Sequence, residues 1–339
     1  METFMPEEDT PRPGDVAVLP RPVESERFKK ARTELAVAKF MGTLVPHGGY
    51  NDCLQKLNIL HLAGRTNREK PRGMLITGAS GTGKSTIAKQ YESYCPSVEE
   101  EERSFIPVLR VELPGQPTAK EIAGALLRAL GDPFDNVGTA EVRMKRVRSL
   151  LKACGVEMII FDEMQHLTDN LDKRQRSIAA DTLKNLMNVS GLPCVFIGTK
   201  ACQDYFVENQ QLGRRCSPKV TLAPFSIATP EAANQFGRAL MTLDAQLPMG
   251  PGSVLVDPKY TAAIYHATHG LLGYVMNLLE GALRRALHSG ARRLTVIHLK
   301  DEFVEVIFPD CKPERNPFDP RFNGIPLWNE GEPFYKLSV

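Results

Sequence analysis

The chain has 339 residues, of which 42% are hydrophobic and 24% are charged, and its formal net charge is +2. This length gives room for a core domain and a smaller one, and the composition is that of an ordinary globular protein. The near-neutral balance excludes a global basic field, so a nucleic-acid surface would have to be a local patch. Because no apolar run approaches the roughly 18 residues of a spanning helix, the sequence predicts no contact with a membrane.

The first residues and the cysteines indicate the compartment. Residues 1–23 are acidic and rich in proline, without the basic-then-apolar pattern of a signal peptide, so we expect a mobile arm. The seven cysteines are scattered and contain no CxxC pair. This spacing indicates reduced thiols and argues against a disulfide framework or a zinc site. Together these features predict a cytoplasmic protein.

Strands and helices alternate through the first two thirds of the chain. Residues 24–61 carry apolar side chains at mixed three-to-four spacing, which predicts a helical extension. Near-continuous apolar strands that alternate with helices predict an α/β core over residues 24–228, with a parallel sheet covered on both faces. We expect strands at 73–78, 105–113, 156–163, 192–199 and 219–226, and helices at 83–94, 118–131, 140–155 and 177–191.

From residue 229 the strand pattern stops, and residues 229–308 predict a small helical lid. Residues 309–339 form a tail without periodicity. This tail is rich in proline and holds the single tryptophan, Trp328, beside several other aromatic residues that include Phe318 and Phe334. Such a segment either orders on a partner protein or packs on its own domains.

Residues 78–86 read GASGTGKST directly after the apolar strand at 73–78. They match the phosphate-binding pattern GxxxxGK[ST], with a strand before it and a helix after it. The glycines let backbone N–H groups surround phosphates at the positive end of the helix. Lys84 would neutralise the β and γ oxygens, and Ser85 would be a ligand of Mg²⁺. The predicted ATP-binding residues of this loop are Gly78, Ser80, Gly81, Thr82, Gly83, Lys84, Ser85 and Thr86.

The apolar strand that ends in Asp162 and Glu163 places two carboxylates at the edge of the sheet where ligands bind. Asp162 would hold, through water, the Mg²⁺ that is bound to the nucleotide, and Glu163 would polarise an attacking water. A kinase that acts on a hydroxyl group has less need of the second carboxylate, so the pair favours hydrolysis. Gln165 and His166 follow closely, and each either acts on Glu163 or packs beneath the site.

Two further motifs follow the acidic pair. Thr199 ends the strand at 192–199, where a hydroxyl group would sense the γ-phosphate or position water, although strands often end in threonine. Arg214 and Arg215 stand before the last strand. A planar cation suits the charge of a transferred phosphoryl group and often comes from a neighbouring subunit, but a solvated arginine pair fits these residues equally well.

The order of these motifs resembles that of the AAA+ ATPase superfamily: GASGTGKS, then IIFDE, FIGT and LGRRC, and finally a helical lid. The strings MIIFDEMQHL and LMNVSGLPCVFIGTKAC are similar to those of the TniB/TnsC transposition ATPases, and the resemblance covers roughly residues 25–305. It implies an α/β AAA+ P-loop NTPase fold with a helical lid. It also implies that Arg215 is the arginine finger and Thr199 the first sensor.

The lid departs from the family pattern. Gly273 and Tyr274 stand where many relatives carry arginines that contact the γ-phosphate. Slow hydrolysis, or a greater dependence on Arg215, is therefore expected.

The resemblance implies an ATPase that oligomerises on double-stranded DNA as a ring or helical filament in the bacterial cytoplasm. The oligomer would recruit and activate a DDE transposase, a TniQ-type target selector would bind elsewhere, and ATP hydrolysis would drive disassembly. The alternative within AAA+ is a replication initiator or helicase loader, but initiators usually carry a further DNA-binding module. A signalling switch ATPase and a small-molecule kinase fit the motifs less well.

Basic residues suggest where DNA would bind, although solvated helix faces would look the same. No helix-turn-helix or zinc module is present in the sequence, so contacts to DNA phosphates without sequence specificity are expected, with strong salt dependence. The candidates are Lys120 at a helix start, Arg143, Lys145 and Arg146 on the helix at 140–155, and Lys173 and Arg174 in the loop after the acidic strand.

Overall fold

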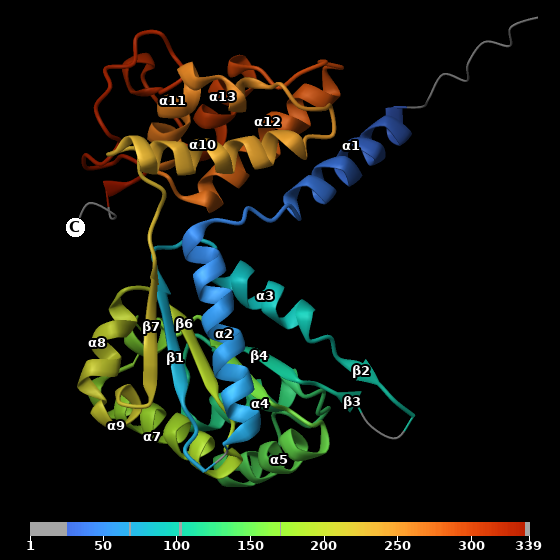
Figure 1. The fold of residues 1–339 in the computed structure, drawn as a ribbon, viewed down its shortest axis with the longest axis vertical. Coiled ribbons are helices and arrows are strands. Elements are labelled where there is room, and N and C mark those ends of the chain that lie inside the picture. The colour runs from blue at the N-terminus through green and yellow to red at the C-terminus, as the bar shows by residue number, and fades with distance from the viewer. Residues whose placement is uncertain (1–25, 68, 102–103, 170, 336–339) are drawn as a thin grey trace, which may run out of the picture.

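The computed structural model describes residues 26–67, 69–101, 104–169 and 171–335 (Figure 1). The predicted arm, residues 1–23, lies outside the described residues. A sheet-containing unit and a helical unit lie one above the other in Figure 1, joined by the chain that leaves the last strand of the sheet.

Within the described residues, five parallel strands form one sheet in the order β4-β5-β6-β1-β7. Strands β1, β5 and β6 are buried along their whole length, because helices cover both faces of the sheet. The predicted parallel α/β sheet is thus confirmed. The strands are β1 (Gly73–Gly78), β4 (Val108–Glu112), β5 (Met158–Asp162), β6 (Cys194–Gly198) and β7 (Cys216–Leu222), and β2 (Val98–Glu99) pairs with β3 (Ser104–Phe105) in a separate hairpin.

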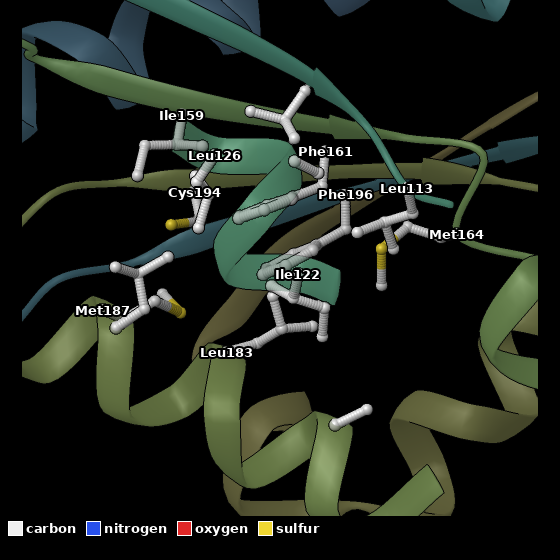
Figure 2. Packing of buried hydrophobic residues seen from close by; sticks show 14 of the residues in the cluster. Leu113, Ile122, Leu126, Ile159, Phe161, Met164, Leu183, Met187, Cys194 and Phe196 are labelled. Atoms are coloured by element: carbon white, nitrogen blue, oxygen red, sulfur yellow. The ribbon is translucent and has the colours of Figure 1, made fainter. Parts of the chain in front are cut away.

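Successive side chains of the strands point to opposite faces of the sheet and belong to two separate hydrophobic layers. On one face α2 (Gly48–Thr66) and α3 (Lys84–Tyr94) cover the sheet. On the other face Phe161 and Phe196 stack with ring centroids 5.5 Å apart. Figure 2 shows them close to the side chains of α4 and α7. This second layer is closed by α4 (Ala119–Ala129), α5 (Ala140–Ala153), α6 (His166–Asp169), α7 (Lys173–Ser190), α8 (Ala201–Glu208) and α9 (Gln210–Gly213).

The helical unit has its own core, and the first helix of the chain belongs to that core. Val37 and Phe40 of α1 (Glu26–Met41) are buried in it, and Glu34 accepts a hydrogen bond from Arg284 at 2.9 Å. The predicted helical stretch at 24–61 is therefore two helices, of which α1 packs on the lid and α2 on the sheet. The other elements of this unit are α10 (Pro230–Ala245), η1 (Val254–Val256), α11 (Pro258–Thr268), α12 (Leu272–His288), α13 (Val296–Glu302), the π-helical turn η2 (Phe303–Ile307) and η3 (Pro313–Arg315).

Local signals predicted some helix ends well. Thr118 caps α4, because its side chain accepts the backbone N–H of Glu121, and Gly131 follows the helix with a φ of +78°. The start of α7 was predicted four residues late. Asp172 and Gln175 form a capping box there, which places Lys173 and Arg174 in the first helical turn and not in a loop.

The tail packs on the lid, which decides between the two alternatives for its aromatic residues. Phe334 is 1% exposed, and its ring lies 5.4 Å from that of His269 and 5.2 Å from that of Tyr274. Arg315 donates to Glu332 at 2.6 and 2.7 Å and so closes the tail on itself. The tail of the described structure is therefore an integral layer of the helical unit.

All seven cysteines are free, as their spacing predicted. Within the described part of the chain, every helix is too short or too polar to cross a bilayer.

We predict that Phe334→Ala lowers the free energy of unfolding by about 3–5 kcal/mol, because it removes a buried ring and leaves a cavity. Urea denaturation followed by circular dichroism measures this. Trp328→Ala is the matched control: this side chain is 43% exposed, so a smaller loss of roughly 1–2 kcal/mol is expected. Equal losses for the two variants would contradict the packing of the tail on the lid.

Candidate active site

The phosphate-binding loop joins β1 to α3. Gly81 and Gly83 have φ values of +80° and +87°, in the left-handed region that glycine adopts without strain. Gly83 directly precedes α3, so the loop surrounds the N-terminal end of that helix. Gly78 is required for another reason: a Cβ atom there would lie 2.4 Å from the carbonyl oxygen of Leu222 on β7.

The ammonium group of Lys84 lies inside this loop. Its Nζ donates to the carbonyl oxygens of Gly78 at 3.0 Å and Ala79 at 2.8 Å. Burial lowers the pKa of Lys84, and the nearby charges of Asp162 and Glu163 oppose this effect. The two acidic residues therefore favour the charged form of the lysine that an anionic ligand needs.

The two carboxylates stand at a sharp turn. Asp162 ends β5, is 4% exposed, and accepts the backbone N–H of Glu163 at 2.9 Å. Glu163 lies just beyond the strand, with a φ of +60° that is strained for a residue other than glycine. The backbone N–H of Met164 donates to Ile197 on β6 at 2.9 Å and pins the turn. Such strain, held by neighbouring strands, is typical of functional sites.

The structure separates the two residues that follow. The side-chain amide of Gln165 donates to the carboxylate of Glu163. His166 instead directs Nδ1 at the carbonyl oxygen of Leu113, 2.9 Å away, beyond the end of β4. His166 therefore joins two loops of the sheet edge, and Gln165 is the residue that contacts Glu163.

A cavity of about 660 Å³ contains the loop and both carboxylates, a size suited to a small-molecule ligand. Its walls come from three parts of the chain: the core, the connection before α2, and the lid. Of the predicted site residues, Gly78 alone among the ATP-binding set is absent from the lining. The lining includes Ser80, Gly81, Thr82, Gly83, Lys84, Ser85, Thr86, Asp162, Glu163, Gln165 and Thr199 from the core, Met41–Val45, His47 and Tyr50 from the N-terminal segment, and Leu272, Gly273, Met276 and Asn277 from α12.

The sequence analysis missed the contributions of residues 41–50 and of α12. No motif marks them, since the first span the junction of α1 and α2 and the second lie in an ordinary amphipathic helix. They reach the cavity through tertiary packing alone.

The lid touches the phosphate-binding loop with its backbone. The N–H of Gly273, in the first turn of α12, donates to the carbonyl oxygen of Gly81 at 2.7 Å. A Cβ atom at position 273 would lie 2.8 Å from the Cα of Gly81. This close approach leaves no room for a side chain at position 273, so an arginine would not fit there.

Oxygen donors suited to Mg²⁺ are present in the cavity. The hydroxyl group of Ser85 and the carboxylate of Asp162 both belong to its lining, and Mg²⁺ is bound by one or two protein oxygens together with substrate phosphates. These two residues therefore fit the ion that an ATP site uses.

Arg215 lies at the opposite edge of the sheet. It directly precedes β7, and its carbonyl oxygen accepts the N–H of Gly73, the first residue of β1. The phosphate-binding loop follows the last residue of β1, so the six residues of that strand separate the two, about 20 Å at the usual rise. Arg215 and Arg214 instead line a second depression at the amino ends of the strands.

The candidate DNA residues divide into buried and exposed groups. Arg143 is 4% exposed and donates to the carbonyl oxygens of Gly138, Lys120 and Asn136. The prediction that it contacts DNA is wrong, because this guanidinium holds a loop together.

Arg146 makes an ion pair with Asp132 at 2.9 Å and also donates to two carbonyl oxygens of the same loop. The proposed DNA contact is disfavoured there too, since its charge is neutralised. The four remaining candidates, Lys120, Lys145, Lys173 and Arg174, are exposed.

Comparison with solved structures shows the fold. The Aeropyrum pernix ORC2 protein in ADPNP and ADP complexes has a TM-score of 0.55 and 17% identity over 74% of this chain. Cdc6p from Pyrobaculum aerophilum has a TM-score of 0.58 and 15% identity over 82%. The Aeropyrum pernix ORC1 protein in complex with DNA has a TM-score of 0.59 and 19% identity over 81%. This chain spans 66%, 72% and 69% of their respective lengths, which is less than two thirds for the first.

A search of curated protein sequences found no match. The family model described as "Bacterial TniB protein" matches residues 42–226, more than half of the chain. The match includes the phosphate-binding loop, the two carboxylates and Arg215, and it ends where the chain enters the lid. The chain therefore belongs to the TniB family and has the fold of an AAA+ P-loop ATPase.

Proposed function

We propose that this chain is an ATP-dependent regulator of DNA transposition. It assembles on double-stranded target DNA when ATP is bound, recruits and activates a DDE transposase, and leaves the DNA when ATP is hydrolysed. One observation carries the assembly: the phosphate-binding loop and Arg215 lie at opposite ends of β1 and β7. A complete site then needs the loop of one copy and the arginine of another.

The chemistry at the loop side follows from the residues of the cavity. Lys84 and the backbone N–H groups of the loop bind the phosphates, and Mg²⁺, held by Ser85 and Asp162, supplies further positive charge there. Glu163 orients and polarises the attacking water as general base. Thr199, in the cavity wall after β6, positions that water or contacts the γ-phosphate.

The chemistry at the far side belongs to the next copy. Arg215 has a planar guanidinium that suits the charge on the transferred phosphoryl group. A head-to-tail contact repeated from copy to copy gives a closed ring or a helical filament. Both forms place ATP between subunits and make its hydrolysis a signal for disassembly.

DNA would bind at the edge of the sheet where β4 and β5 end. The exposed Lys120 stands at the start of α4, and the exposed Lys173 and Arg174 stand at the start of α7. The hydrogen bond between His166 and Leu113 joins the segment that leads into α4 to the segment that leads into α7. Lysine and arginine side chains there would contact phosphates without reading the sequence. A transposase and a TniQ-type selector would then meet the DNA-bound oligomer.

We predict that Glu163→Gln retains ATP and remains on duplex DNA, because it removes the general base but not the phosphate-binding groups. Turnover should fall by about a hundredfold to ten-thousandfold. Sedimentation with duplex DNA, ATP and Mg²⁺ measures assembly, and phosphate release measures turnover.

Lys84→Ala is the control for that variant, since by itself, without subunits that bind ATP, it should lose nucleotide binding and fail to assemble. Release of Glu163→Gln from DNA as fast as the unaltered chain would contradict the role of hydrolysis in disassembly.

We predict that Arg215→Ala lowers turnover by about a thousandfold, the scale of a lost arginine finger, and that mixing it with Lys84→Ala subunits restores part of the activity. In the mixture, an intact loop from one variant meets an intact arginine from the other. Phosphate release across a series of mixing ratios tests this. Turnover that stays flat at every ratio would rule out a finger supplied by the neighbouring copy.

We predict that Gly273→Ala weakens ATP binding by about fivefold to a hundredfold, the usual cost of overpacking, because the added methyl group collides with Gly81. Titration with a fluorescent ATP analogue measures the affinity. Gly237→Ala in α10 is the control, since nothing lies within 4 Å of a Cβ atom there. Unchanged affinity in Gly273→Ala would show that the lid does not need this contact to bind ATP.

A further inference from the structure

A cluster of positive side chains lies at the amino ends of β1 and β7. A depression of about 540 Å³ is lined there by Lys70, Arg72, Arg214 and Arg215, and Glu69 is the one carboxylate among its described lining residues. Lys70, Arg72 and Arg214 are exposed, and Arg215 is half-buried. So many cations around one hollow repel one another, and an anion in the hollow would relieve this repulsion.

These cations differ from several arginines of the described structure, whose charges are paired with carboxylates. Arg65, Arg110 and Arg128, for example, form ion pairs with Glu157, Glu92 and Asp135. Over the ranges that the structure describes, none of the four cluster residues has a carboxylate within ion-pair distance. Their charges are therefore available to a ligand or to a second molecule.

The backbone holds Arg72 and Arg215 side by side. The N–H of Gly73 donates to the carbonyl oxygen of Arg215 at 2.8 Å, and Gly73 pairs with Cys216 in the parallel ladder. Each arginine is thus the residue directly before a paired position on adjacent strands. The carbonyl oxygen of Arg72 also accepts the N–H of Cys194, at 3.2 Å, which fixes this end of β1 between its two neighbours.

We propose that Arg72 acts together with Arg215 on the polyphosphate chain of the ATP held by a neighbouring copy. The inference rests on the proposed function, because it assumes that Arg215 completes a site between subunits. Two adjacent guanidinium groups offer paired N–H donors that match phosphate oxygens. The lid has Gly273 in place of an arginine and supplies no positive charge at that position. Arg72 compensates for part of this charge.

The first test compares Arg72→Ala with Arg238→Ala, a control at an exposed arginine of α10 that lies outside the cluster. Turnover at saturating ATP in the presence of duplex DNA should fall by about tenfold to a hundredfold in Arg72→Ala, the range for losing a charge-assisted hydrogen bond. Affinity of the dilute, unassembled chain for a fluorescent ATP analogue should stay unchanged. Arg72→Lys, which keeps the charge but not the paired donors, should recover part of the loss. Equal turnover in Arg72→Ala and Arg238→Ala would overturn the inference.

The second test mixes Arg72→Ala with Lys84→Ala subunits at several ratios. Recovery of turnover supports action on the neighbour's ATP, because only mixed interfaces combine an intact loop with an intact Arg72. No recovery, while the mixture of Arg215→Ala and Lys84→Ala does recover, overturns the role of Arg72 and leaves the proposed function standing. Failure of both mixtures overturns the shared site itself. Normal turnover of Arg72→Ala with weaker duplex binding assigns the cluster to DNA and also overturns the inference.

Discussion

The hydrogen bond from the N–H of Gly273 to the carbonyl oxygen of Gly81 fixes the position of the lid on the core. It joins the first turn of α12 to the phosphate-binding loop at 2.7 Å, and only glycine permits so close an approach at position 273. The cavity depends on this contact, since α12 forms one of its walls. The tail depends on it indirectly, because Phe334 packs on Tyr274, the next residue of the same turn. Lid, tail and loop therefore form one continuous packing arrangement.

Strand β1 has a similar linking role within the core. It lies between β6 and β7, carries the phosphate-binding loop after its last residue, and follows Arg72 at its first. A buried six-residue strand is stiff, so a displacement at one end is transmitted to the other. If Arg72 contacts the ATP of a neighbouring copy, the presence of that ATP would affect the position of the phosphate-binding loop in the copy that carries Arg72. In the proposed assembly, the strand order would thereby provide a direct route between successive ATP sites.

Much of the ATP site could be predicted from the sequence, because its residues are adjacent in sequence and carry distinctive chemistry. The loop at 78–86 and the Asp162–Glu163 pair follow apolar strands, and both reach the same sheet edge by the geometry of a parallel sheet. What could not be predicted depends on contacts between distant segments. Arg143 has the pattern of an exposed helix residue, yet carbonyl oxygens from a preceding loop and from α4 bury its guanidinium. The packing of α1 on the lid likewise has no signature in the sequence of that helix.

The arrangement of charges also explains why hydrolysis would depend on assembly. Within one copy, Lys84 is the cation of the phosphate-binding loop, and α12 brings a backbone N–H to that loop. The strained Glu163 is held by the amide of Gln165, so the proposed general base is already positioned in a single copy. Among the described residues that line the cavity, Lys84 and Lys89 are the cations, and a guanidinium to stabilise the phosphoryl group as it leaves is absent. Arg215 and Arg72 lie too far along β1 to supply it in the same copy, so a subunit without a neighbour at this interface would bind ATP and retain it.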